Sequence, residues 1–290
     1  MFPGRAAGEI TIQDDWGESV SLPGPAKRII SLYGAFNEIL AGMGLEKRIV
    51  ARTKADELPG LLGKPGIGTH MRPNVEMVLG LCPDVVLQIG GRSEALSAVR
   101  QIKAHGIPVV VFNPVTLDEL FSVIVRIGRL TQEQEKALDL IERMKARLDA
   151  VRSRLHGVFS EGAPRPSVFF EVRYPNLLGA GQGSIVNDVI ARAGGVNCVG
   201  SDKKIVRLSE EALLGLNPDA YVVQTGPMNV NPLPPCERPL FTSLRAVRTA
   251  RVLEVDEKEF SRPGPRIVQA VEELARFLHP EVMKDIKALP

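Results

Sequence analysis

Hydrophobic residues recur at steps of four and three along one stretch near the middle of the chain. The residues that this spacing places on one helical face are Ala137, Ile141, Met144, Leu148, Val151 and Leu155. Thr131 and Gln134 have the spacing of a capping box, and neither Gly nor Pro interrupts residues 131–155. The pattern predicts one continuous amphipathic helix, about 36 Å long at 1.5 Å per residue, which could join two domains as a rigid spine.

Short apolar runs alternate with amphipathic segments on both sides of this helix. Before it, the predicted strands are 28–32, 49–52, 85–89 and 109–112, and the predicted helices are 37–43, 74–81 and 93–105. After it, the predicted strands are 168–172, 221–224 and 252–255, and the predicted helices are 184–193, 209–216 and 267–278. Such alternation at short spacing predicts an α/β fold with mostly parallel sheets.

These elements divide the chain into three parts. We expect an N-terminal α/β lobe over residues 1–115, a connecting helical spine over 116–156 and a C-terminal α/β lobe over 157–290. The length of 290 residues agrees with two domains, each large enough to bury its own core.

The two halves share a repeated segment. Residues 76–84 and 211–219 have Glu, Leu, Gly, Leu, Pro and Asp at the same positions. In each copy a short predicted helix meets a Pro that cannot continue it, and an apolar strand follows the Asp. Residues 37–41 and 187–191 also resemble each other. The repeat indicates that one α/β unit was built twice.

Ligands of parallel α/β sheets bind at the carboxyl ends of the strands, so two such lobes predict a ligand cleft between them. The side chains expected to line it are Tyr33, Phe36, His70, Met71, Arg72 and Arg92 from the first half, and Arg173, Tyr174, Phe260 and Arg262 from the second. Arginine pairs with carboxylate or phosphate and aromatic rings cover apolar faces. The lining therefore favours a flat or bulky anionic ligand.

Composition excludes several other classes of protein. A hydrophobic content of 44% and a charged content of 24% are ordinary globular values, and a net charge of +2 argues against a nucleic-acid binder. The chain shows neither a signal peptide nor a membrane span, which leaves open whether a precursor carried a leader or lipid anchor. Its three cysteines form no C-x-x-C motif, and pairing of Cys198 with Cys236 stays open.

The chain from residue 27 to residue 279 resembles the periplasmic binding proteins that deliver ferric siderophores, haem and cobalamin to ABC importers. The stretches that carry the resemblance are 28–32 with 37–40, 73–76 through 83–87, 193–197, 208–211 through 218–219, and 262–266. The resemblance implies two Rossmann-like lobes joined by one long rigid helix. It also implies a monomeric, periplasmic or extracytoplasmic protein without enzymatic activity or intrinsic cofactor, whose transported ligand is a metal chelate.

The resemblance also implies a docking role for the repeated glutamates. In the cobalamin-binding relative, one surface glutamate on each lobe docks against arginines of the permease dimer, and Glu76 and Glu211 fall on those positions. Each also begins a predicted helix, and the repeat places them symmetrically, which suits a two-fold symmetric partner. A glutamate in the first turn of a helix can instead merely offset the helix dipole.

Several alternatives remain at this point. The sequence lacks G-x-S-x-G and P-loop motifs, yet a cytoplasmic α/β enzyme with an unrecognised site stays possible. The four histidines lack metal-ligand spacing, although a binder of a small oxyanion or metal ion could use the same fold. His70, Tyr33, Met71 or Tyr174 could be an axial ligand to a haem or corrinoid metal. The central helix could also form a coiled-coil dimer.

Overall fold

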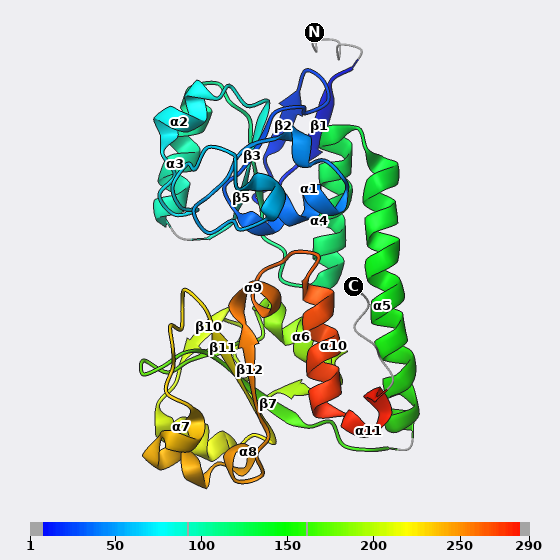
Figure 1. Ribbon diagram of the computed structural model, residues 1–290, viewed down its shortest axis with the longest axis vertical. Coiled ribbons are helices and arrows are strands. Elements are labelled where there is room, and N and C mark those ends of the chain that lie inside the picture. Colours follow the sequence, from blue (N-terminus) through cyan, green and yellow to red (C-terminus); the bar gives the residue numbers. More distant parts are fainter. Residues whose placement is uncertain (1–7, 92, 161, 285–290) are drawn as a thin grey trace. The chain divides into compact units, whose positions relative to one another are not determined.

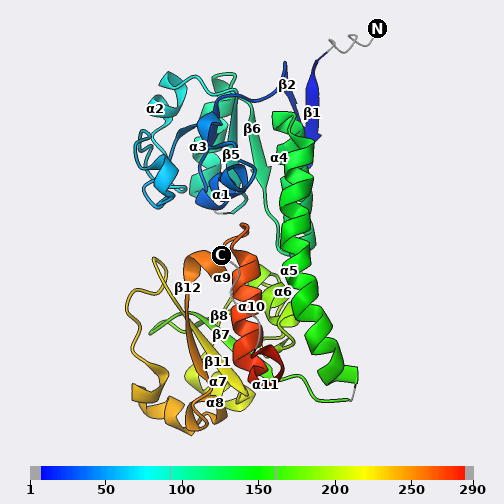
Figure 2. The ribbon, with the colours of Figure 1, turned by 45° about the vertical axis from the view of Figure 1, so that its right-hand side comes forward.

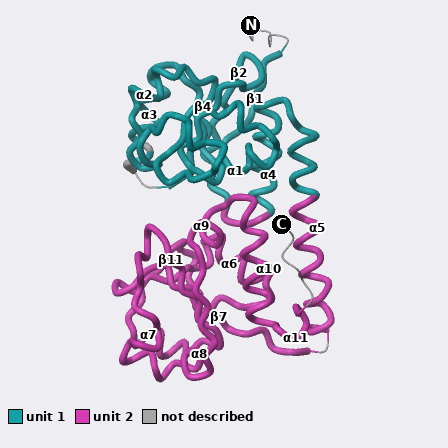
Figure 3. Tube along the Cα trace, viewed as in Figure 1, with its two compact units in different colours: residues 1–114, 118–142 teal, residues 115–117, 143–290 magenta. Residues whose placement is uncertain are grey.

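The structure is a computed structural model that describes residues 8–91, 93–160 and 162–284. Its internal contacts divide the chain into two compact units (Figure 3). Unit 1 comprises residues 1–114 and 118–142, and unit 2 comprises residues 115–117 and 143–290.

Unit 1 contains a four-stranded parallel sheet in the order β4-β3-β5-β6. Its strands are β3 (Ile29–Ser31), β4 (Ile49–Ala51), β5 (Val85–Ile89) and β6 (Val109–Phe112) (Figure 1). Its helices include α1 (Gly34–Gly42), α2 (Val75–Gly80) and α3 (Ser93–Ala104), and 3-10 turns lie at Glu46–Arg48 and Pro59–Leu61. All residues of β3, β5 and β6 are buried, as in parallel strands covered on both faces. β1 (Ile10–Gln13) and β2 (Ser19–Leu22) form an antiparallel hairpin.

Unit 2 contains a six-stranded mixed sheet. Its strands are β7 (Ser167–Arg173), β8 (Leu178–Ala180), β9 (Val196–Asn197), β10 (Ile205–Arg207), β11 (Ala220–Thr225) and β12 (Val252–Asp256). Its helices are α6 (Ile185–Arg192), α7 (Glu210–Leu216), α8 (Arg245–Arg248), α9 (Glu257–Phe260), α10 (Ile267–Leu278) and α11 (Pro280–Met283), with 3-10 turns at Pro235–Glu237 and Pro239–Ser243. β8 pairs antiparallel with β7 and with β10, and neither β8 nor β10 was predicted from the sequence.

The two sheets share one strand order. β7 pairs in parallel with β9 and β11, and β11 pairs in parallel with β12. The order β9-β7-β11-β12 therefore repeats β4-β3-β5-β6, with β8 and β10 as additions in unit 2. The prediction of two α/β units with mostly parallel sheets is confirmed.

The aspartate of the repeated segment has the same structural role in both units. The Asp84 carboxylate accepts hydrogen bonds from the backbone N–H groups of Lys27 (2.7 Å) and Arg28 (2.8 Å), just before β3. The Asp219 carboxylate accepts from the backbone N–H (2.9 Å) and the hydroxyl (2.8 Å) of Ser167, at the start of β7. Each aspartate thus satisfies backbone donors of the neighbouring strand, which gives the Pro-Asp repeat a physical reason.

The central helical segment differs from its prediction at one end. α4 (Leu117–Thr131) runs through Gly128, and α5 (Gln134–Ser160) is a separate helix of 27 residues that appears as one continuous ribbon in Figure 2. The Thr131 hydroxyl donates to the carbonyl oxygen of Ile127 (2.8 Å) at the end of α4, so the predicted capping box is wrong. A Cβ at Gly128 would lie 2.7 Å from that of Ala137, and glycine therefore permits close packing of the two helices. The role of α5 as a rigid spine stays a prediction.

Candidate functional site

An aromatic and imidazole pair lies at the carboxyl edge of the unit 1 sheet. Tyr33 follows β3, and its ring meets that of His70 edge-on with centroids 5.7 Å apart. Gln88, a buried residue of β5, donates its amide N–H to the backbone oxygen of His70 (3.0 Å). The sheet therefore fixes the loop that carries His70, while Tyr33 and His70 both stay partly exposed. Such a pair can cover the apolar face of a ligand and offer it an imidazole nitrogen.

A tight turn next to His70 holds two further predicted ligand residues. Met71 is half-buried and Arg72 is exposed. The backbone N–H of Arg72 donates to the Thr69 hydroxyl (3.1 Å), and a Cβ at Gly68 would lie 2.6 Å from the Arg72 carbonyl oxygen. Gly68 also has a φ of +94°, so only glycine fits this turn without strain. Arg92, the remaining arginine predicted in this half, lies outside the described residues.

Arg173 ends β7 at the carboxyl edge of the unit 2 sheet. Its side chain is half-buried and forms no ion pair with the part of the chain that the structure describes. A half-buried guanidinium without a neutralising carboxylate keeps its donors and its charge for an anion. Arg173 is therefore the strongest candidate for an anion-binding residue at this edge.

Arg262 lies beyond β12 at the same edge but already has a carboxylate partner. Its Nη2 lies 4.0 Å from Oε1 of Glu257, which is itself buried. The other carboxylate oxygen of Glu257 accepts a hydrogen bond from the backbone N–H of Met228 (2.8 Å), in the loop after β11. Glu257 thus ties two edge loops together, and its charge reduces what Arg262 offers to an anion.

Tyr174 rests on a buried ion pair. The Arg238 guanidinium lies 3.7 Å from the centroid of the Tyr174 ring and forms two hydrogen bonds with the Glu171 carboxylate, one of them 3.0 Å long. Arg238 is 1% exposed and Glu171 is 0% exposed, so both charges depend on each other. The Tyr221 hydroxyl also donates to Glu171 (2.5 Å), and burial, together with the charge of Glu171, raises the pKa of Tyr221 well above its usual range. One face of Tyr174 is therefore covered by protein.

Two of the predicted ligand residues face inward. Phe36 is 0% exposed and packs edge-on against Phe112, with ring centroids 5.5 Å apart. Phe260 is 0% exposed and stacks on Phe170 at 6.1 Å. A fully buried ring cannot contact a ligand without rearrangement, so we correct the expectation for both residues and assign them to the support of their loops.

Three buried polar residues beneath the carboxyl edges of the sheets were not predicted from the sequence. Gln224, buried in β11, donates to the Val172 carbonyl oxygen (3.1 Å) and accepts from the Ser261 hydroxyl (2.5 Å). Gln88 has the corresponding function in unit 1, and Glu171 begins the ion-pair network of unit 2. A single Gln or Glu within an otherwise apolar strand is the signal that could have identified all three, because a buried polar group needs partners.

Glu76 and Glu211 lie where the repeat places them. Both are exposed and occupy the first turns of α2 and α7. The N-caps are Asn74 and Ser209, whose side chains accept from the backbone N–H groups of Met77 (3.0 Å) and Ala212 (3.1 Å). Hydrogen bonds from its own backbone N–H and from Ser209 lower the pKa of Glu211. These contacts leave both carboxylates accessible to a partner.

The described residues add three observations on ligands and location. Residues 8–91, 93–160 and 162–284 contain no group of three His, Cys, Asp or Glu side chains that could hold a metal ion. Cys198 and Cys236 are free thiols, as is the exposed Cys82. The helices of the described chain include none that is both long enough and apolar enough to cross a membrane.

Each of the two α/β units has aromatic or arginine side chains at the carboxyl edge of its sheet. This arrangement indicates a ligand-binding protein built on a duplicated fold. The periplasmic binding protein family matches residues 29–259. The uncharacterized ABC transporter substrate-binding lipoprotein YvrC of Bacillus subtilis is 30% identical over 279 residues, covering 95% of this chain and 87% of that protein. This chain therefore belongs to the periplasmic binding protein family.

Solved structures agree on the fold. The apo heme-binding protein RhuT of Roseiflexus sp. RS-1 has a TM-score of 0.74 at 24% identity, covering 89% of this chain and 99% of that one. The vitamin B12-binding protein BtuF of Vibrio cholerae has a TM-score of 0.73 at 24% identity, covering 90% and 99%. The chain is thus a substrate-binding protein of the ABC importer class rather than an enzyme. Membership in this class implies a small-molecule ligand, a permease partner and an extracytoplasmic location.

Proposed function

We propose that this protein captures an anionic metal chelate or tetrapyrrole, of the ferric siderophore, haem or cobalamin kind, and delivers it to its permease. The observation that carries the proposal is the half-buried Arg173, which forms no ion pair within the described chain at the carboxyl edge of its sheet. Tyr33 and His70, which supply an aromatic face and an imidazole in unit 1, support it. Relatives named as heme-binding and vitamin B12-binding proteins agree with this ligand class.

We further propose that Arg72, in unit 1, and Arg262, in unit 2, are secondary anion contacts. A thermal melt and an absorption spectrum with cyanocobalamin, haem and several ferric siderophores test the ligand class. At a hundredfold excess over its dissociation constant, a true ligand stabilises the protein by about 2.7 kcal/mol. Stabilisation by none of these compounds contradicts the proposed class.

The Arg173→Ala variant tests the residue that carries the proposal. Loss of one charge-assisted contact should weaken binding by roughly tenfold or more. Arg248→Ala is a matched control, because Arg248 is an exposed arginine on α8 that no ligand edge contains. Equal affinity of Arg173→Ala and wild type would remove Arg173 from the site. His70→Ala loaded with haem tests axial ligation, which predicts a shifted visible absorption band.

Docking through Glu76 and Glu211 is tested separately from ligand binding. In the double variant Glu76→Arg with Glu211→Arg, permease binding and transport should be lost while ligand affinity stays unchanged, because both residues lie at exposed helix starts. Glu135→Arg is the control for charge reversal, because Glu135 is an exposed glutamate in the first turn of α5. Unchanged permease binding by the double variant would refute the docking role.

A further inference from the structure

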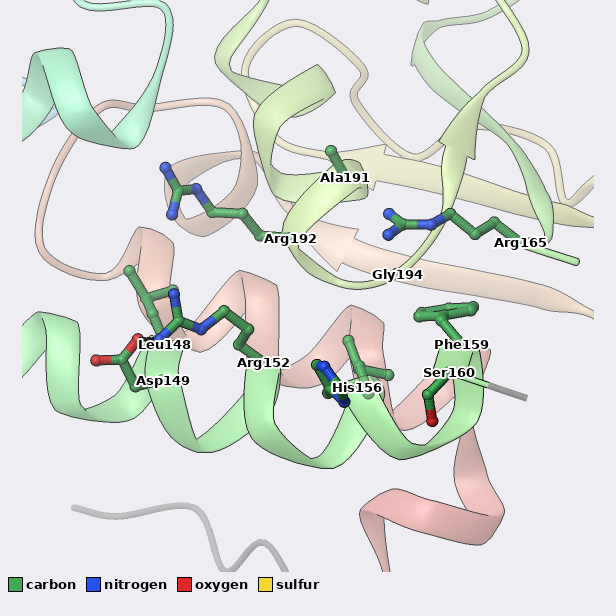
Figure 4. Close-up of a pocket in the computed structure, with 11 residues that line it drawn as sticks. Leu148, Asp149, Arg152, His156, Phe159, Ser160, Arg165, Ala191, Arg192 and Gly194 are labelled. Carbon is green, nitrogen blue, oxygen red and sulfur yellow. Dashed lines mark ion pairs between the residues drawn. The ribbon is translucent and has the colours of Figure 1, made fainter. Parts of the chain in front are cut away.

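Unit 2 contains a groove that is separate from the carboxyl edge of its sheet. It lies between the second half of α5 and the end of α6, and its volume is about 490 Å³ (Figure 4). The side chains and backbone that line it come from Leu148, Asp149, Arg152, Leu155, His156, Phe159, Ser160, Arg165, Ala191, Arg192 and Gly194. The volume falls within the range of small-molecule sites, roughly 300–1,000 Å³.

The charges of the groove favour an anion. Its lining has three guanidinium groups, from Arg152, Arg165 and Arg192, against the single carboxylate of Asp149. Arg152 pairs with Asp149 (3.0 Å) on the helix surface, where the pair is weak. Arg192 pairs with Asp188 (2.9 Å). Arg165 is exposed and forms no ion pair with any described residue, so its charge is available to a ligand.

Arg165 is also held in place before any ligand arrives. Its guanidinium lies 4.6 Å from the centroid of the Phe159 ring, above which Figure 4 shows it. The Phe159 ring in turn meets the His279 ring edge-on at 5.5 Å. A Cβ at Gly194 would lie 2.8 Å from Nε2 of His279 and 3.1 Å from Phe159, so glycine permits this approach. A pre-organised guanidinium loses less entropy on binding than a mobile one.

The floor of the groove is apolar. Leu148 and Leu155 lie about two turns apart on α5 and are 8% and 5% exposed. In Figure 4 the guanidinium groups of Arg152 and Arg192 lie towards the Leu148 end, whereas Arg165 lies at the Phe159 end. The groove thus combines Arg165, which no described carboxylate neutralises, with the short apolar surface of Leu148 and Leu155. This combination suits a ligand with an anionic head and an apolar body.

We propose that this groove binds an amphipathic anion, with its carboxylate or phosphate on Arg165 and its acyl or aryl body along Leu155 and Leu148. The ligand would bridge α5 and the end of α6 within unit 2. This site is independent of the proposed cargo site, because none of its lining residues lies at the carboxyl edge of the sheet.

Isothermal titration calorimetry with monomeric octyl phosphate and with inorganic phosphate tests the proposal. Octyl phosphate should bind at least roughly tenfold more tightly than inorganic phosphate, and Arg165→Glu should weaken octyl phosphate by roughly tenfold or more. Arg248→Glu is the matched charge-reversal control, and Arg173→Ala should keep octyl phosphate binding, which separates this groove from the cargo site. Equal affinity for the two phosphates, or wild-type affinity in Arg165→Glu, would overturn the proposal.

Flotation with phosphatidylglycerol and phosphatidylcholine vesicles distinguishes two sources of the same ligand chemistry. Flotation with phosphatidylglycerol alone, lost in Arg165→Glu, identifies a membrane lipid as the source. Binding of octyl phosphate without flotation identifies a free amphiphile. Absence of both would overturn the site, and circular dichroism of Arg165→Glu verifies that this surface variant is folded.

Discussion

Removing Arg238 should destabilise unit 2 far more than removing an exposed arginine. Glu171 is 0% exposed, and in the Arg238→Met variant it loses both guanidinium hydrogen bonds. Only the Tyr221 hydroxyl and the Asn229 amide (3.2 Å) remain to stabilise its charge. Breaking a buried ion pair on one side costs about 3–5 kcal/mol. The lost contact of Arg238 with the Tyr174 ring adds about 1–2 kcal/mol.

Urea unfolding followed by circular dichroism measures this loss, and hydrogen exchange of the β7 and β11 amides assigns it to unit 2. The whole effect corresponds to a fall in melting temperature of roughly 2–4 °C per kcal/mol for a unit of this size. Arg248→Met is the control, since Arg248 is exposed and should change the unfolding free energy by less than about 0.5 kcal/mol.

A double-mutant cycle separates charge isolation from simple loss of packing. Glu171→Leu combined with Arg238→Met removes both charges, so it should be more stable than Arg238→Met alone, although Tyr221 and Asn229 then lose an acceptor. If Arg238→Met lies within about 1 kcal/mol of wild type, or if the two single effects simply add, the interpretation of Glu171 and Arg238 as mutually dependent charges is refuted.

Three further predictions concern unit 2. Burial raises the pKa of Cys198 to about 12. A thiol reagent at pH 8 should therefore label the two exposed cysteines promptly and Cys198 only after unfolding. Prompt labelling of all three cysteines would contradict this prediction. Burial, with neighbouring positive charge, lowers the pKa of His279 below its ordinary 6.5, so stability should fall as the pH drops below 6.5, and His279→Asn should flatten that dependence in melts across pH. Arg147 donates two 2.8 Å hydrogen bonds to the buried Glu272 of α10. Arg147→Ala should therefore lower the free energy of unfolding, measured in urea, by about 1.5–3 kcal/mol. An unchanged urea midpoint would show that the pair contributes nothing to stability.

The strands and the duplication could be predicted because they depend on local pattern. β5, β6 and β11 are nearly continuous apolar runs, and the Pro-Asp dipeptides before β5 and β11 mark the same structural position in both units. β8 and β10 escaped prediction because each has three residues and gains its partners only from the antiparallel pairing with β7 and with each other. Tertiary pairing, rather than intrinsic propensity, defines such short strands.

The site was less predictable because sequence position does not fix side-chain direction. Thr131 has both the spacing of a helix cap and the ability to bond back to Ile127, and only the structure decides between the two. Phe36 and Phe260 sit in the expected segments but turn inward. Arg173 and Arg262 look alike in the sequence, yet Glu257, which pairs with only one of them, makes them chemically different.

β10 bears on how this protein behaves at high concentration. It terminates the sheet of unit 2, so one side of its backbone has no strand to bond within that sheet. Open edges invite pairing between molecules, and natural proteins oppose this with short strands and basic side chains. β10 has only three residues, is directly preceded by the exposed Lys204 and ends in the exposed Arg207. Replacing both cations with valine would leave a longer apolar edge, and self-association through strand pairing should follow.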